Sequence, residues 1–213
     1  MRRIVVVDLG TGNLHSVSKA LEHVAGGVTV KVSAEPAVIA AADHVVLPGQ
    51  GAIGTWFKAL GKDTLHQAIT IALASRPVLG ICLGLQALFD HSDEDGGTTG
   101  LGVLAGQVRR FGSGENTRGQ ELKVPHMGWN NVTQHGEHPL WLGIPQDTRF
   151  YFVHSYYADA RAPDQVAGTT DYGVRFTSAA TADNVFAVQF HPEKSHAQGL
   201  KLLENFVNWD GGT

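Results

Sequence analysis

Cysteine, whose thiol can act as a nucleophile, occurs only once in the chain. This cysteine, Cys82, lies in the stretch GICLG at residues 80–84, between an apolar β-branched run and a helical pattern. A lone cysteine often packs only as a small apolar side chain. The pattern G-x-C-x-G is, however, the thiol counterpart of the nucleophile elbow, a sharp turn that presents a nucleophile at the end of a strand. Both interpretations are open from this stretch alone.

An elbow at Cys82 has specific physical requirements. Any side chain at the positions two residues before and after the cysteine would collide in such a turn. The glycines at both positions, Gly80 and Gly84, meet this requirement. The sulfur would lie at the start of the helix expected from residue 83 to 89, where the helix dipole and free N–H groups favour a thiolate. The N–H of Leu83 would point to where an oxyanion forms.

A second stretch, QFHPEK at residues 189–194, contains the base that a thiolate nucleophile needs. His191 and Glu193 are two residues apart, and such residues face the same side of an extended chain. The carboxylate would then orient the imidazole, and the imidazole would face the sulfur. The alternative is a surface loop with a solvated histidine and glutamate. The choice depends on whether the fold brings the two stretches together.

The first half of the chain predicts a parallel sheet that positions these residues. Buried apolar runs alternate with helical patterns, and this order is typical of an α/β fold with helices on both faces of the sheet. Asn13 is a candidate N-cap for the first helix, in which apolar residues recur at helical spacing. The expected strands are residues 3–8, 28–32, 44–49 and 77–81, and the expected helices are 14–24, 37–42, 52–60, 64–75 and 83–89.

After about residue 100 the pattern becomes strand-rich and is typical of mixed or antiparallel pairing. Residues 185–190, VFAVQF, form the last expected strand, and residues 199–209 form an amphipathic helix. We therefore expect a mostly parallel central sheet covered by helices on both faces, with an antiparallel, strand-rich extension. No linker divides the sequence, so residues 1–213 are predicted to form a single domain.

Composition excludes several classes of function. The net charge of -4 and the pI near 6.2 argue against nucleic-acid and anionic-membrane partners. The 11 histidines are scattered without metal-ligand spacing, so no metal and no cofactor is expected. A single cysteine fits a reducing compartment, and no apolar run is long enough to span a membrane. These features predict a cytoplasmic protein.

The stretches GICLGLQ and QFHPEKS together resemble the paired signature of class I glutamine amidotransferases. The resemblance implies that Cys82 attacks the side-chain amide of L-glutamine, that His191 shuttles the proton and that Glu193 orients His191. Water then releases glutamate from a γ-glutamyl thioester. By the same resemblance, Gly49 and Gln50 of the stretch LPGQG complete an oxyanion hole with Leu83. Similar proteins usually have a small apolar residue at the position of Gln50.

The same resemblance implies a set of glutamine-binding residues. Gln86 would line the pocket one helical turn beyond the nucleophile, and Glu94 would meet the α-amino group. The backbone at Ser155 and Tyr156 would bind the carboxylate end, and Gly51 would contribute from the oxyanion loop. An acidic loop that is merely solvated is the alternative for Glu94, which lies between two aspartates.

Further stretches narrow the resemblance to one branch of the family. DLGTGNLHSV (8–17), PHMGWN (125–130) and YFVHSYY (151–157) resemble the glutaminase subunits of imidazole glycerol phosphate synthase. This resemblance implies a heterodimer with a (β/α)8-barrel cyclase, to which ammonia is channelled. The products are imidazole glycerol phosphate and aminoimidazole carboxamide ribotide, in histidine biosynthesis. Residues that would face the cyclase are Asn13, Trp129, Tyr151 and Lys194.

Three other functions remain alternatives. The first is the glutaminase subunit of another pathway, such as anthranilate, aminodeoxychorismate or pyridoxal phosphate synthesis. The second is a stand-alone γ-glutamyl hydrolase or related cysteine peptidase, which would need no partner. The third is an interaction subunit without catalysis, against which the presence of Cys82, His191 and Glu193 argues.

Overall fold

A parallel sheet forms the first half of the molecule, as the sequence predicts. The computed structural model describes residues 2–61, 63–112 and 122–212. The parallel strands have continuous apolar sequences because helices cover both of their faces. Their spatial order is β2-β1-β3-β4-β13, with bounds β1 Arg3–Val7, β2 Thr29–Ser33, β3 His44–Leu47, β4 Val78–Ile81 and β13 Val185–Val188.

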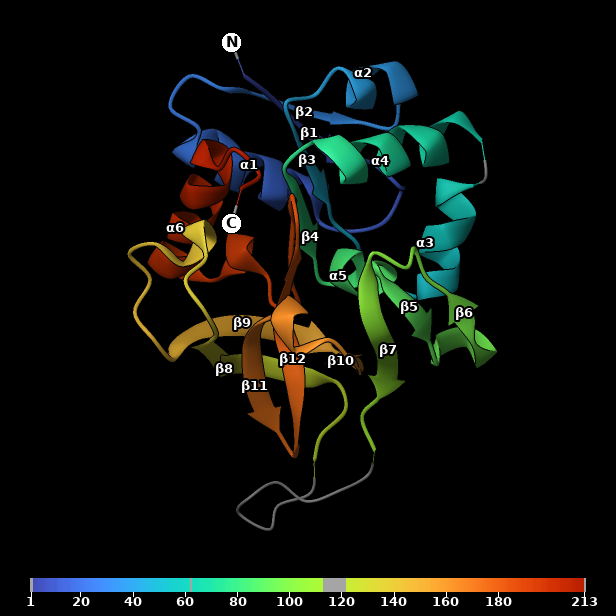
Figure 1. The fold of residues 1–213 in the computed structure, drawn as a ribbon, viewed down its shortest axis with the longest axis vertical. Helices are drawn as coiled ribbons and strands as arrows, with labels where there is room; N and C mark the ends of the chain where they lie inside the picture. Colours follow the sequence, from blue (N-terminus) through green and yellow to red (C-terminus); the bar gives the residue numbers. More distant parts are fainter. Residues whose placement is uncertain (1, 62, 113–121, 213) are drawn as a thin grey trace.

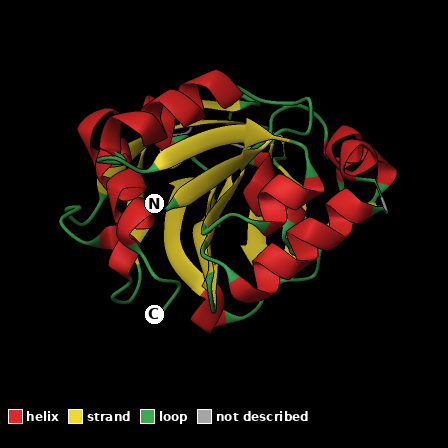
Figure 2. Cartoon of the chain, turned by 90° about the horizontal axis from the view of Figure 1, so that it is seen from above, coloured by secondary structure: helices red, strands yellow, loops and turns green. Residues whose placement is uncertain are grey.

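Helices lie on both sides of this sheet, and Figure 2 shows the strands running between them. Side chains of α1 and α6 bury one face, while those of α2, α3 and α4 bury the other (Figure 1). The Asn13 side chain accepts a hydrogen bond from the Ser16 N–H at 3.2 Å, which confirms it as the N-cap of α1. The helices are α1 Leu14–Val24, α2 Pro36–Ala40, α3 Ile53–Leu60, α4 Thr64–Ser75, α5 Leu83–Ala87 and α6 His196–Asn208.

The second half extends the sheet with mostly antiparallel pairs. From β13 the order continues β12-β10-β7-β5-β6, and β11, β8 and β9 branch from β12. The strands are β5 Phe89–Ser92, β6 Thr98–Thr99, β7 Leu104–Arg110, β8 His126–Gln134, β9 Thr148–His154, β10 Tyr156–Ala160, β11 Val166–Tyr172 and β12 Val174–Ala182. Short 3₁₀ turns are Glu94–Gly96, Pro139–Trp141, Pro163–Gln165 and Pro192–Lys194. The predicted fold class is confirmed.

Several expected boundaries differ from the structure, among them those of β2, β3 and α2, and three of them bear on the site. The helix expected over 83–89 ends at Ala87, because Phe89 is already paired with Leu104 in the sheet. The last strand ends at Val188 rather than at 190, since the chain bends there toward a 3₁₀ turn. The last helix begins at His196 instead of residue 199. In each case tertiary pairing or a turn, rather than local propensity, decides where the element ends.

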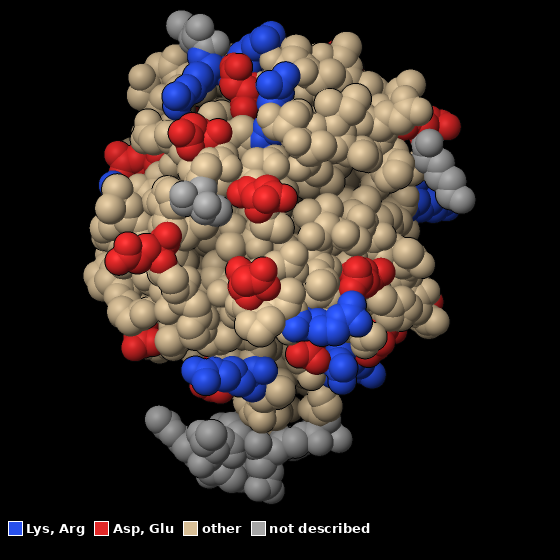
Figure 3. All heavy atoms as spheres, in the orientation of Figure 1, with Lys and Arg blue, Asp and Glu red and all other residues tan. Residues whose placement is uncertain are grey.

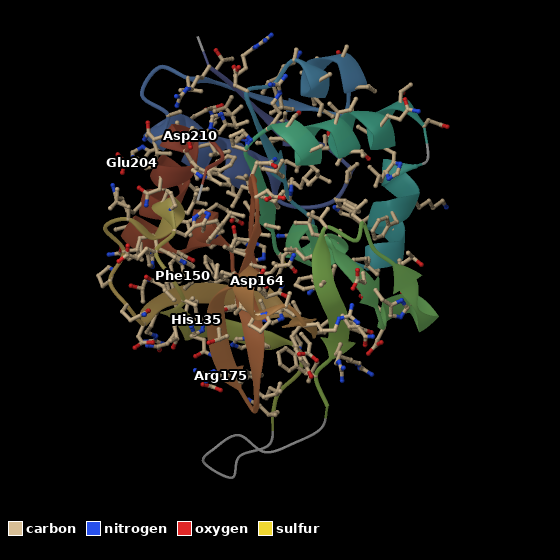
Figure 4. All side chains as sticks on the ribbon, viewed as in Figure 1. His135, Phe150, Asp164, Arg175, Glu204 and Asp210 are labelled. Atoms are coloured by element: carbon tan, nitrogen blue, oxygen red, sulfur yellow. The ribbon has the colours of Figure 1, made fainter. Side chains whose placement is uncertain are left out.

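Aromatic packing holds the segment around residue 190 against β9. Phe150, labelled in Figure 4, lies fully buried on β9 and stacks on Phe190 with 4.1 Å between ring centroids. The His191 N–H donates to the Tyr151 carbonyl at 2.9 Å, and the Ser195 hydroxyl donates to the His191 carbonyl at 2.6 Å. These contacts fix the backbone that carries His191.

Two further properties bear on the partners that the protein can have. Among the described residues, no helix combines the length and the apolar character needed to cross a bilayer. On the face shown in Figure 3, acidic and basic side chains are interspersed instead of forming one basic patch. That face is therefore not a surface of the kind that binds a nucleic-acid backbone.

The glycines around Cys82 are required by close packing, as the sequence predicts. A Cβ at Gly84 would lie 1.8 Å from the Leu47 carbonyl oxygen, and a Cβ at Gly80 would lie 2.9 Å from the Ala187 side chain. The elbow is thus pressed directly against its neighbouring strands β3 and β13.

We predict that Gly84→Ala destabilises the protein by at least about 2 kcal/mol, because the added methyl group must displace backbone. Urea unfolding followed by circular dichroism measures the loss. Gly112→Ala is the matched control, since no atom of the described residues beyond its chain neighbours lies within 4 Å of the added Cβ. Equal unfolding midpoints for the two variants would contradict the packing argument.

Candidate active site

A pocket of about 380 Å³ opens at the carboxyl end of the parallel strands. It lies between the elbow after β4, the loop after β3 and the bend between β9 and β10. Carboxyl ends of parallel strands are where ligands bind in open α/β sheets. Its lining residues are Gln50, Gly51, Cys82, Leu83, Gln86, Glu94, Pro125, Val153, His154, Ser155, Tyr156 and Lys194.

Cys82 occupies the strained position of the elbow. Its backbone has φ 56° and ψ -105°, in the region that residues other than glycine rarely adopt. Strain of this kind persists only where the surroundings impose it. Here the Cys82 N–H donates to the Val188 carbonyl at 2.8 Å, and the side chain is 7% exposed. The strained backbone directs a nearly buried thiol to the pocket.

His191 and Glu193 form a buried pair. His191 Nδ1 and Glu193 Oε1 are 2.8 Å apart, and their side chains are 2% and 1% exposed. The predicted contact exists, but its expected geometric origin is wrong. The residues are not on an extended strand, because Pro192 starts a 3₁₀ turn that brings Glu193 back toward the imidazole.

The charges around His191 favour its protonated form. Burial by itself lowers the pKa of His191, but the negative charge and hydrogen bonding of Cys82, together with Glu193, raise that pKa to about 10. The imidazole thus lies within electrostatic range of the sulfur, and its buried Nε2 has no hydrogen-bond partner among the described residues. A protonated His191 in turn stabilises negative charge on Cys82 Sγ. The fold therefore brings together the two stretches that are far apart in the sequence.

The loop after β3 packs tightly on the elbow. A Cβ at Gly49 would lie 2.8 Å from both the Leu83 Cβ and the Trp56 Cδ1 atom, so only glycine fits there. Trp56 Nε1 also donates to the Pro48 carbonyl at 3.2 Å. Gly51 has φ +91°, which only glycine adopts without strain. The structure thus places the loop of Gly49, Gln50 and Gly51 beside Leu83, whose N–H begins a helix and has no intrahelical acceptor.

Gln86 joins the elbow helix to the opposite wall of the pocket. Its Nε2 donates to the Tyr156 carbonyl at 2.9 Å. The same carbonyl accepts from His154 Nδ1 at 2.7 Å, so His154 Nε2 is the acceptor in its 3.0 Å contact with His126 Nδ1. Burial lowers the pKa of His154 to about 3 and that of His126 to about 4, so both are neutral near pH 7. This neutral chain holds the backbone of 154–156 in place.

Glu94 lines the pocket but also has a structural contact. Its Oε2 accepts from the Ile53 N–H at 3.1 Å, at the start of α3, while Asp95 accepts from the Gly54 N–H at 3.0 Å. Burial raises the pKa of Glu94, the Ile53 hydrogen bond lowers it, and the neighbouring Asp95 raises it, with a net increase. Glu94 and Asp95 are therefore held in place by the N-terminus of α3 and are not free in solvent.

Three of the four expected partner-facing residues form one cluster beside the pocket. Trp129 and Tyr151 are directly paired on β8 and β9, with ring centroids 6.1 Å apart. Lys194 Nζ lies 6.0 Å from the centre of the Tyr151 ring. Trp129 is 37% exposed, so it is not part of the core. Asn13, the fourth, lines a small cavity with Gly49, Gln50, His191 and Glu193.

Sequence reasoning missed four residues near the site. Pro125, Val153 and His154 line the pocket. Gln189 lies behind the pocket, where its Nε2 is 3.7 Å from Cys82 Sγ. All four lie in stretches that the sequence analysis singles out: Pro125 in PHMGWN, Val153 and His154 in YFVHSYY, and Gln189 in QFHPEK. The contact of Gln189 with the thiol depends on the pairing of β4 with β13.

We predict that Glu193→Gln lowers the pKa of His191 from about 10, because the substitution removes a carboxylate that raises it. The imidazole would then lose its proton at lower pH than in the parent protein. A ¹⁵N NMR titration of the histidine ring nitrogens measures this directly, with the His191 signal assigned by its loss in His191→Asn. An unchanged titration would contradict the pairing of Glu193 with His191.

Comparisons with known proteins agree with this geometry. A family model described as "Glutamine amidotransferase class-I" matches residues 5–209. The chain is 54% identical to the imidazole glycerol phosphate synthase subunit HisH of Thiobacillus denitrificans, over 98% of this chain and 92% of the relative. It is also 54% identical to subunit HisH 1 of Pseudomonas aeruginosa, over 99% of both chains.

A structural comparison supports the fold independently. A solved glutamine amidotransferase superposes with a TM-score of 0.70, covering 96% of this chain and 97% of that chain at 18% identity. Likeness at that identity concerns the fold alone, whereas the similarity to the HisH subunits covers nearly the whole sequence. The chain belongs to the class I glutamine amidotransferases, and within them to the family of HisH subunits of imidazole glycerol phosphate synthase.

Proposed function

We propose that this protein is the glutaminase subunit of imidazole glycerol phosphate synthase, acting in the cytoplasm in histidine biosynthesis. It hydrolyses L-glutamine to glutamate and ammonia and passes the ammonia to a (β/α)8-barrel cyclase. The observation that carries the proposal is the strained Cys82 at the pocket, in electrostatic contact with the buried His191–Glu193 pair. The full-length similarity to HisH subunits supports the choice of pathway.

The first half of the reaction forms a thioester. Cys82 Sγ, as the thiolate, attacks the side-chain amide carbon of glutamine, and the carbonyl oxygen becomes an oxyanion. N–H groups of Leu83 and of the loop at Gly49 and Gln50 stabilise that charge. His191, held by Glu193, donates its Nε2 proton to the amide nitrogen, and the C–N bond breaks to release ammonia.

The second half restores the enzyme. Water attacks the γ-glutamyl thioester while the now neutral His191 accepts a proton from it. The C–S bond breaks, glutamate leaves, and Cys82 returns to the thiolate beside a protonated His191. The sum is glutamine plus water giving glutamate plus ammonia. Glu193 keeps its contact with Nδ1 throughout and so fixes which imidazole nitrogen faces the sulfur.

The pocket has groups of the right kind for the two ends of glutamine. Glu94 supplies a carboxylate for the α-amino group, and the backbone of Ser155 and Tyr156 is proposed for the α-carboxylate; all three residues line the pocket. Gln86 and Gly51 also line it. A charged anchor at each end would align the substrate amide with Cys82 Sγ.

A partner is needed because ammonia released into neutral water is protonated and loses its nucleophilicity. The exposed aromatic and apolar side chains beside the pocket support docking of the cyclase there, with Trp129 as an anchor and Met127, at 62% exposure, on the same strand. Tyr151 connects this surface to the catalytic base, because its carbonyl accepts the His191 N–H. Asn13 would contact the partner from beside the Gly49 loop.

We predict that Cys82→Ala abolishes glutamine-dependent synthesis in the complex but leaves synthesis from added ammonium salt intact. The substitution removes the nucleophile and leaves the cyclase chemistry unaffected. Imidazole glycerol phosphate formation, measured with either nitrogen source, tests this. Loss of both activities would mean that Cys82 is structural and would contradict its catalytic role.

We also predict that glutamine hydrolysis by the isolated chain is slow and that the cyclase carrying its nucleotide ligand accelerates it. The proposed cause is a rearrangement of the Gly49–Gln50 peptide that completes the oxyanion hole. Trp129→Ala should weaken the acceleration at limiting cyclase concentration by removing an interface anchor. Leu142→Ala, which alters an exposed apolar residue outside the proposed interface, should not.

Equal glutaminase rates with and without the loaded cyclase would contradict conditional activation. Steady hydrolysis of γ-glutamyl peptides by the isolated chain would instead favour a stand-alone hydrolase. Activation by the synthase of another pathway would move the protein to that pathway while leaving its glutaminase chemistry unchanged.

A further inference from the structure

Gln189 has a side-chain position that the proposed mechanism does not use. It follows β13, is fully buried, and its N–H donates to the Ser178 carbonyl at 2.9 Å. Its carboxamide lies between two residues of the site: Nε2 is 3.7 Å from Cys82 Sγ, and Oε1 accepts from Gln86 Nε2 at 3.0 Å. A buried carboxamide contacting a candidate nucleophile calls for an explanation beyond packing.

The hydrogen-bond partners determine which end of this carboxamide faces the sulfur. The Tyr156 carbonyl can only accept, so the Gln86 atom that contacts it must be the NH₂ group. That NH₂ group is also 3.0 Å from the Gln189 side chain, which must therefore present its oxygen to it. The other end of the Gln189 carboxamide, the NH₂ group, then faces Cys82 Sγ as a donor.

A donor at this position would add to the stabilisation that His191 gives to negative charge on the sulfur. The helix after Cys82 has only the five residues Leu83–Ala87, so its dipole is small. The sulfur is nearly buried, which limits stabilisation by water. His191 supplies positive charge, but it gives up a proton during the reaction. A neutral amide donor keeps its hydrogens at every stage.

We propose that Gln189 stabilises the thiolate of Cys82 and fixes the position of Sγ through an N–H···S hydrogen bond. Gln86 orients the Gln189 carboxamide from the pocket side. This inference rests on the proposed role of Cys82 as the nucleophile. It assigns to the first residue of the stretch QFHPEK a function separate from that of the His191–Glu193 pair.

The test measures the alkylation of Cys82 by iodoacetamide as a function of pH, in the full chain. Alkylation proceeds through the thiolate, so its rate reports how well the thiolate is stabilised. Gln189→Leu and Gln189→Met keep approximately the same volume and remove the donor. We expect each to slow alkylation at neutral pH by about tenfold and to move the pH–rate profile upward, since hydrogen bonds to charged groups have effects of this order.

Ser178→Ala is the matched control. Ser178 is a buried residue on the neighbouring strand β12, and its hydroxyl has no hydrogen-bond partner among the described residues. The bond from the Gln189 N–H to the Ser178 carbonyl survives the substitution. Its alkylation profile should equal that of the parent protein. Circular dichroism and thermal unfolding establish that the variants compared are folded.

A measurement on the unsubstituted protein covers the case in which both Gln189 variants unfold. The side-chain amide protons of Gln189 should shift in NMR spectra when Cys82 is alkylated, because alkylation removes the acceptor. Unshifted protons, or folded Gln189 variants with the parent profile, would overturn the inference about Gln189. If alkylated parent protein retained full cyclase-activated glutaminase activity, the nucleophile proposal itself would fail.

Discussion

The pairing of β4 with β13 is the constraint on which the site depends. The two parallel strands end at the same edge of the sheet, and the Cys82 N–H closes their ladder on the Val188 carbonyl at 2.8 Å. Beyond this contact the two strands continue differently. The chain after β4 turns at Cys82 into the elbow helix α5, and the chain after β13 bends before His191. The Cys82 thiol and the His191 imidazole, which are far apart in the sequence, thereby become neighbours. Any change that separated these strands would leave each side chain without the other.

Close backbone packing makes this arrangement rigid. Gly84 lies against the Leu47 carbonyl and Gly49 against Leu83 and Trp56, so the elbow, β3 and the loop after β3 constrain one another. Preorganised groups are effective in catalysis because they need little rearrangement when charge develops. The strained φ of Cys82 is compatible with this packing, which supplies the surrounding contacts that maintain it.

The antiparallel half of the sheet provides the remaining functional elements. Its β9 carries the Tyr151 carbonyl that holds His191, and the same residue belongs to the exposed cluster proposed to meet the cyclase. The bend between β9 and β10 forms the far wall of the pocket, held by Gln86 and the neutral His154–His126 chain. A docked partner would therefore contact a strand that is directly bonded to His191, the proposed catalytic base, which would give activation a short physical route.

The sequence by itself determined the first four parallel strands with their helices, the elbow and the identities of the triad candidates, whereas the parallel pairing of β13 with β4 came from the tertiary structure. Continuous apolar strands, glycine spacing and capping residues such as Asn13 are local signals that follow from sterics and burial. The tertiary structure alone decided that α5 stops at Ala87, that Glu193 reaches His191 through a 3₁₀ turn, and that Gln189 meets Cys82. These features depend on contacts between segments distant along the chain. Local pattern carries no information about such contacts until strand order and register bring the segments together.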